Sequence, residues 1–149
     1  MPRYNCPEDG FDLRQCYEFE YILIGDLRDL LEDPFDDENR RWLVAVVDAL
    51  LETLPREFEL KSQEGYLADV LEEFPNWDSE VARLEQQYAV LCSRLAQLRE
   101  RIMSRNPLQE ISERLKIELE AWMDAFARLH RDEQQLVLSA ANLEVGAGD

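Results

Sequence analysis

The sequence is poor in histidine, cysteine, glycine and proline. Its 149 residues include one histidine, three cysteines, five glycines and six prolines. The cysteines (Cys6, Cys16 and Cys92) contain no CxxC pair, which argues against a zinc finger. Their odd number, together with the absence of a secretory segment, predicts reduced thiols in the cytosol. The scarcity of glycine and proline leaves long uninterrupted stretches, and these favour helices.

Long apolar runs are also missing. No stretch approaches the roughly 20 residues that a membrane-spanning helix needs. The N-terminus lacks the apolar core of a signal peptide. We therefore expect a cytoplasmic protein that does not enter a membrane.

Positive charge is scarce. The chain has 33 acidic and 16 basic residues, a net charge of −17. Nucleic acids and anionic membrane surfaces are bound through clustered lysine and arginine, so neither is an expected partner. The sequence also lacks a nucleophile elbow, a phosphate-binding loop and an HExxH motif, and we expect no enzymatic activity.

Apolar residues recur at spacings of three and four, the pattern of amphipathic helices. They predict helices over 17–31, 39–61 and 78–105, and a last helix from Asn106-Pro107 to its close at Gly146 and Gly148. Pro55 should bend the second helix without ending it. The prediction is an all-α, up-down-up-down four-helix bundle over 16–149. It has a short helical insertion, Tyr66 to Glu73, between helices two and three, and an irregular arm at 1–15.

Polar residues interrupt these apolar stripes at four positions, Glu57, Lys61, Tyr88 and Glu133. A buried carboxylate must be paired, protonated or bound to a metal, because an isolated buried charge is costly. These residues define a candidate interior pocket. Glu57 and Lys61 have an open alternative, in which they reach solvent at the end of their helix. A tyrosine at such a position is most often an aromatic core residue whose hydroxyl finds one partner, and this is the simpler interpretation of Tyr88.

His130, the single histidine, follows the stripe residue Leu129 and is expected at the surface, pointing away from the interior. Cys92 follows the stripe residue Leu91, and we expect a half-buried structural thiol there.

Three stretches of the chain resemble the bacterial hemerythrin-like four-helix bundle family. The first runs from Asn39-Arg40-Arg41-Trp42-Leu43 through Leu50-Leu51 to Phe58. The second is Glu64-Gly65-Tyr66-Leu67, followed by Pro75 and the helix near Val81. The third is the C-terminal Glu144-Val145-Gly146-Ala147-Gly148-Asp149.

The resemblance implies a non-haem di-iron centre held by about five histidines and two carboxylates. This chain has, at the matching positions, Ile24, Glu57, Lys61, Tyr88, Leu129 and Glu133. Only Glu133 keeps a ligand type, and no metal or other cofactor is expected. Lys61 stands where a ligand carboxylate would be, and we expect its ammonium to pair with Glu133 and supply the missing positive charge.

The favoured function is therefore a non-catalytic scaffold or an interaction and regulatory module that has lost its di-iron site. Its partner would be another protein or a second copy, with Trp42 and Trp77 as exposed contacts. One alternative is a carboxylate-rich bundle that binds iron or manganese and handles oxygen or metal. A small-molecule binder that uses the vacated pocket is a third possibility.

Overall fold

The computed structural model describes residues 12–33, 36–63, 66–104 and 113–147. Its elements are α1 (Leu13–Glu32), α2 (Asp37–Gln63), α3 (Tyr66–Glu73), the 3-10 turn η1 (Pro75–Trp77), α4 (Asp78–Met103) and α5 (Glu113–Ala147). The prediction of an all-α protein is confirmed for these ranges, which contain no strand. None of the helices within them is both long enough and apolar enough to cross a membrane.

Helix α1 begins at Leu13, four residues before the expected start, so the predicted arm extends too far. Asp12 caps the helix, because its side chain accepts a hydrogen bond from the Gln15 amide at 2.9 Å. The Gln15 side chain in turn accepts one from the Asp12 amide at 2.9 Å. This reciprocal pair is a capping box, which satisfies two amides that a helix start leaves without partners.

Helix α2 starts after Asp36, whose side chain accepts a hydrogen bond from the Asn39 amide at 2.8 Å and so caps the helix. The helix continues through Pro55 to Gln63. Helix α5 runs through Gly146 and ends at Ala147, between the two glycines that are expected to close it. The Asn106-Pro107 start signal and Gly148 lie outside the described residues.

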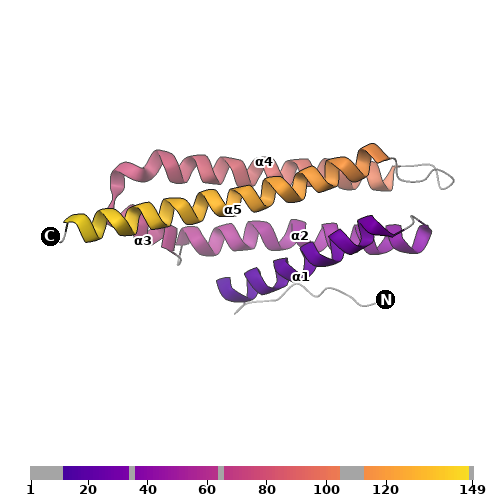
Figure 1. Ribbon diagram of the computed structural model, residues 1–149, viewed down its shortest axis with the longest axis horizontal. Helices are drawn as coiled ribbons and strands as arrows, with labels where there is room; N and C mark the ends of the chain where they lie inside the picture. The colour runs from indigo at the N-terminus through magenta and orange to yellow at the C-terminus, as the bar shows by residue number, and fades with distance from the viewer. Residues whose placement is uncertain (1–11, 34–35, 64–65, 105–112, 148–149) are drawn as a thin grey trace.

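The long helices α1, α2, α4 and α5 lie lengthwise beside one another, with α3 and η1 at one end (Figure 1). Each long helix contacts the next along the chain, and α1 and α5 are also in contact. Short α3 contacts α2, α4 and α5. The inner faces of the long helices therefore converge on one shared interior.

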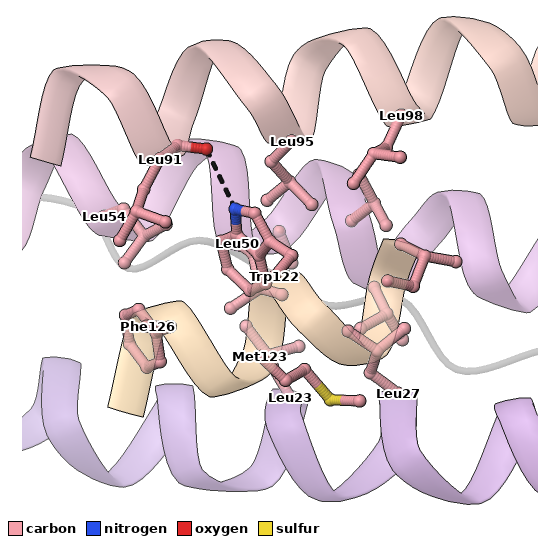
Figure 2. Packing of buried hydrophobic residues seen from close by; sticks show 14 of the residues in the cluster. Leu23, Leu27, Leu50, Leu54, Leu91, Leu95, Leu98, Trp122, Met123 and Phe126 are labelled. Carbon is pink, nitrogen blue, oxygen red and sulfur yellow. Dashed lines mark hydrogen bonds between the residues drawn. The ribbon is translucent and has the colours of Figure 1, made fainter. Parts of the chain in front are cut away.

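Much of this interior is apolar (Figure 2). Leucines of α1, α2 and α4 surround Trp122 of α5, which is fully buried. The Trp122 indole donates a hydrogen bond to the Leu91 carbonyl at 2.9 Å, and its ring stacks on Phe126 with centroids 5.5 Å apart. Each buried leucine contributes about 1.5–3 kcal/mol relative to an exposed one, so this region supplies most of the driving force for packing.

The interior turns polar at the same level on every long helix. On each long helix, a polar residue lies one turn from the last apolar residue of this region and on the same face. The pairs are Leu23 and Glu20 on α1, Leu54 and Glu57 on α2, Leu91 and Tyr88 on α4, and Phe126 and His130 on α5. Beyond this polar level, buried apolar residues resume on α4 and α5 with Leu84, Val81 and Ala140. The polar residues thus form a layer within the core.

Candidate functional site: a buried ionic layer

Lys61 is at the centre of the polar layer and is 0% exposed. Its ammonium donates hydrogen bonds to Glu57 Oε1 at 2.7 Å, to the Tyr88 hydroxyl at 2.7 Å and to Glu133 Oε2 at 2.9 Å. These acceptors come from α2, α4 and α5, and they use all three protons of the ammonium. Lys61 therefore links three helices through one charged atom.

The charge on Lys61 is secured by its neighbours. Burial by itself lowers the pKa of Lys61, because it disfavours the charged amine. The interactions with Glu57, followed by Tyr88 and Glu133, have the opposite effect and together are stronger, so the pKa of Lys61 is raised. The Lys61 ammonium also lies 5.0 Å from the Tyr17 ring centroid and 5.1 Å from that of Tyr88. The amine is consequently a permanent buried cation at neutral pH.

Glu57 is the anion that pairs most closely with this cation. It is fully buried, one helical turn before Lys61. Burial opposes its ionisation, but a hydrogen bond from His130 and the charge of Lys61 lower the pKa of Glu57 to about 2. Glu57 is therefore ionised throughout the neutral range.

Tyr88 joins the two carboxylates on either side of Lys61. Its hydroxyl lies 3.2 Å from Glu57 Oε2 and 3.1 Å from Glu133 Oε2, so its single proton can serve either oxygen. Burial, followed by the charge of Glu57, raises the pKa of Tyr88, and the phenol stays neutral. At Glu133 burial outweighs the attraction of Lys61 and raises the pKa of that carboxyl.

The structure thus brings together all four residues singled out from the sequence, Glu57, Lys61, Tyr88 and Glu133. The Lys61 ammonium lies 2.9 Å from both oxygens of Glu133, with hydrogen-bond geometry to Oε2. For Glu57 and Lys61, the solvent-exposed alternative is wrong, because both are fully buried.

Glu20 belongs to the same layer and was missed in the sequence. It is 2% exposed, and neither of its carboxyl oxygens has a hydrogen-bond donor among the described residues. Burial, followed by the negative charge of Glu57, raises the pKa of Glu20 to about 10. At neutral pH Glu20 is therefore protonated beside the ionised Glu57.

The signal for Glu20 was present in the spacing of Cys16, Glu20, Leu23, Leu27 and Leu31, which forms the buried stripe of α1. The same spacing is also met by Phe19, Leu23, Leu27 and Leu30, and a stripe predicted through these residues leaves Glu20 out. Phe19 and Leu30 are, however, only half-buried. A shift of one residue around the helix removed Glu20 from the predicted interior.

The expectation that His130 lies at the surface and points away from the interior is wrong. Its ring is 25% exposed, and Nε2 lies 3.4 Å from both Glu57 Oε1 and the Tyr88 hydroxyl. The ring packs on Phe126 with centroids 4.4 Å apart. His130 follows Phe126 by four residues and precedes Glu133 by three, so it shares their face of α5. At this level the buried face of α5 is wide enough to include both Leu129 and His130.

Two positions that the resemblance assigns to histidine ligands are part of the apolar core. Leu129 is buried, and Ile24 packs against the core cluster. With a single histidine in the whole sequence, five imidazole ligands are impossible. The residues present therefore do not fit a hemerythrin-type di-iron pair.

One side of the ionic layer opens to solvent. A cavity of about 440 Å³ between α1 and α5 is lined by Tyr17, His130, Glu133, Gln134, Val137 and Leu138. His130 and Glu133 thus connect the buried charges to the outside. Small solutes and ions have a path to this part of the layer.

The cysteines within the described ranges take no part in hydrogen bonding to the charged layer. Cys92 is half-buried, as expected, and burial raises the pKa of its thiol. Cys16 is buried next to Glu20, and burial raises its pKa to about 11. Both thiols are therefore protonated and poorly reactive at neutral pH.

Fold and site together define an all-helical protein with a buried cluster of ionisable side chains at its centre. No family model, no curated protein and no solved structure matches this chain.

Proposed function

We propose that this chain is a divergent hemerythrin-like bundle of up-down-up-down topology that has lost its di-iron pair. In this proposal it acts as a non-catalytic scaffold or as an interaction and regulatory module. One observation carries the proposal: the Lys61 ammonium binds acceptors on three helices at the place where the resemblance puts a metal ligand.

An ammonium can take over the structural role of a metal pair but not its chemistry. Like a metal ion, Lys61 offers a positive charge to Glu57 and Glu133 and ties their helices together. It has no redox states and no open coordination position at which oxygen can bind. Leu129 and Ile24 fill space that ligands would otherwise need. This combination supports a module whose helices are held in place without oxygen chemistry.

The loss of the di-iron pair is tested on protein purified from cells grown with added iron. Elemental analysis should find fewer than two iron ions per chain. Exposure to oxygen, peroxide or azide should produce no ligand-to-metal charge-transfer band. Two iron ions per chain together with such a band would overturn the proposal.

The interaction role is supported by large apolar side chains on the outer surface. Tyr21 is 83% exposed and its neighbour Ile22 on α1 is also exposed. Trp42 and Trp77, the contacts expected from the sequence, are half-buried, and Trp77 packs on Phe74 with ring centroids 6.2 Å apart. The α1 pair is therefore the better candidate for a contact surface.

Light scattering coupled to size exclusion, over a wide range of protein concentration, tests self-association through this pair. The expected result is an oligomer that the double variant Tyr21→Ser with Ile22→Ser converts to monomer. Ile117→Ser, which changes an exposed apolar residue on α5, is the matched control and should leave the oligomer intact. A monomer at every concentration would leave only a different protein as partner.

A further inference from the structure

Three side chains of the ionic layer converge on one point from three different helices. Glu20 of α1, Glu57 of α2 and His130 of α5 each place one possible ligand atom within 4.8 Å of the other two. Both oxygens of Glu20 are buried without a hydrogen-bond donor among the described residues. A buried carboxylate in this condition needs a proton or a cation beside it.

The charges of the layer are unbalanced when its carboxyls are ionised. Within the described ranges, Glu20, Glu57 and Glu133 are buried together with one lysine, Lys61. The protons of Lys61 are already directed at Glu57, Tyr88 and Glu133, so none remains for Glu20. The shortfall of two positive charges equals the charge of one divalent cation.

We propose that Glu20, Glu57 and His130 form a binding site for a single divalent transition-metal ion. One imidazole and two carboxylates suit zinc, iron(II), manganese(II) or cobalt(II), whereas calcium and magnesium prefer oxygen ligands alone. Such ligands lie about 2.0–2.2 Å from the ion, which places them about 3.4 Å from one another in a tetrahedral site. His130 Nε2 and Glu57 Oε1 already lie 3.4 Å apart. Because the three ligand atoms lie within 4.8 Å of one another, no separation has to shrink by more than about 1.4 Å.

Solvent reaches the site from one side. His130 lines the cavity of about 440 Å³ between α1 and α5 and also lies 3.4 Å from Glu57. Of the three ligand residues, His130 is the one that lines this cavity, so an incoming ion reaches the imidazole from solvent.

Lys61 sets the strength of this site. Its ammonium lies 2.7 Å from Glu57 and repels a dication that binds the same carboxylate. Lys61→Met removes this repulsion and leaves the carboxylates without their cation. The variant should therefore bind metal more tightly than the natural sequence, and the metal should restore stability that the substitution removes.

The experiment uses the full chain, freed of metal with a chelator and titrated with zinc chloride. Calorimetry should find one ion per chain, and the melting temperature should rise with zinc. Glu20→Gln and His130→Gln should each weaken binding at least tenfold, whereas Glu52→Gln, an exposed acid of α2, should change it less than twofold. Circular dichroism establishes that each variant is folded.

Cobalt(II) gives a second readout, which a purely structural role of His130 would not affect. The bound ion should show a visible d–d band whose position and intensity change in His130→Gln. In Lys61→Met, zinc should raise the melting temperature by more than in the natural sequence. This rescue should disappear when Glu20→Gln is added.

Absence of zinc binding would overturn the inference. Binding that is equally strong in Glu20→Gln and His130→Gln would also overturn it, because the ions would then be held by surface acids. The inference goes beyond the proposed function, since a single ion here would be structural or regulatory. If the zinc titration fails, the proposal of a module without a di-iron pair is unaffected. If two iron ions per chain are found, that proposal is refuted, but the site of Glu20, Glu57 and His130 is not.

Discussion

Lys61 and Glu133 are separated by 72 residues in the chain, yet the Lys61 ammonium donates a hydrogen bond to Glu133 Oε2 at 2.9 Å in the buried interior. The bond joins the C-terminal part of α2 to the middle of α5. Unlike the surface pair of Arg99 and Asp48, it is shielded from water and salt on nearly all sides. The two residues thus fix the relative position of two helices that are not consecutive.

Such a buried pair contributes to specificity more than to net stability. Desolvation of the ammonium and the carboxylate costs several kcal/mol and offsets much of their attraction. A slip of α5 by one turn would separate Glu133 from Lys61 and leave both charges unpaired. The pair therefore penalises wrong alignments of α5 more strongly than it stabilises the correct one.

Lys61→Met should destabilise the protein by about 3–5 kcal/mol, because Glu57 and Glu133 then lose their common cation. The double variant Lys61→Met with Glu133→Leu should recover a large part of this loss, since fewer buried charges remain unpaired. Urea denaturation of both single variants and of the double variant gives the coupling free energy directly.

The matched control is Asp48→Asn, which removes the partner of Arg99 at the surface. Arg99 and Asp48 are 30% and 43% exposed, and their separation should cost about 0–1 kcal/mol. If Lys61→Met costs no more than this control, the internal ion pair does not exist in solution.

The sequence predicts most of the helices and, of the six residues in the ionic layer, all but Glu20 and His130. The stripes of α2, α4 and α5 have regular spacings of three and four, so a polar residue on them is recognisable as an interior residue. These stripes predict Glu57, Lys61, Tyr88 and Glu133 as interior residues, and in the structure Lys61 and Tyr88 join the two carboxylates.

Glu20 and His130 could not be assigned in the same way. Both sit beside an apolar residue that satisfies the stripe equally well, Phe19 and Leu129 respectively. How wide the buried face of a helix is depends on the neighbouring helices, which a single stripe does not encode. The capping box of Asp12 and Gln15 was missed for a different reason, because the nearby Pro7 and Gly10 suggested an irregular arm.

Asp36→Ala should destabilise the protein by about 1 kcal/mol, because it leaves the Asn39 amide at the start of α2 without its side-chain acceptor. Asp36→Asn keeps an acceptor oxygen at the same place and should cost only a few tenths of that amount. Urea midpoints of the two variants measure the difference. Equal losses in both would mean that the cap is not the reason for the effect.

Trp122→Phe should cost about 1–3 kcal/mol, because it removes the hydrogen bond to the Leu91 carbonyl and leaves a small cavity in the core. Trp122 is fully buried, whereas Trp42 and Trp77 are partly exposed. The variant should therefore also lose the most blue-shifted part of the tryptophan fluorescence. Trp77→Phe is the control and should keep that part. Retention of the blue-shifted component in Trp122→Phe would contradict the buried position of its ring.

Glu20→Gln should make stability less dependent on pH. The pKa of Glu20 is raised to about 10 in the folded protein, from 4.5 as its ordinary value. Between these values the folded state holds a proton that the unfolded state has released. The contribution of the protonated carboxyl to the free energy of unfolding is therefore fully present below pH 4.5. It falls as the pH rises, by no more than about 1.4 kcal/mol per pH unit.

Glutamine has the shape of the protonated acid and has an amide that can donate a hydrogen bond, but it does not ionise. The variant should equal the natural sequence in stability near pH 5 and exceed it increasingly up to pH 9, as measured by urea denaturation at each pH in the presence of a chelator. Glu52→Gln, which changes an exposed carboxylate of α2, should run parallel to the natural sequence over the same range. A constant difference between Glu20→Gln and the natural sequence would show that Glu20 does not carry a proton in the folded state.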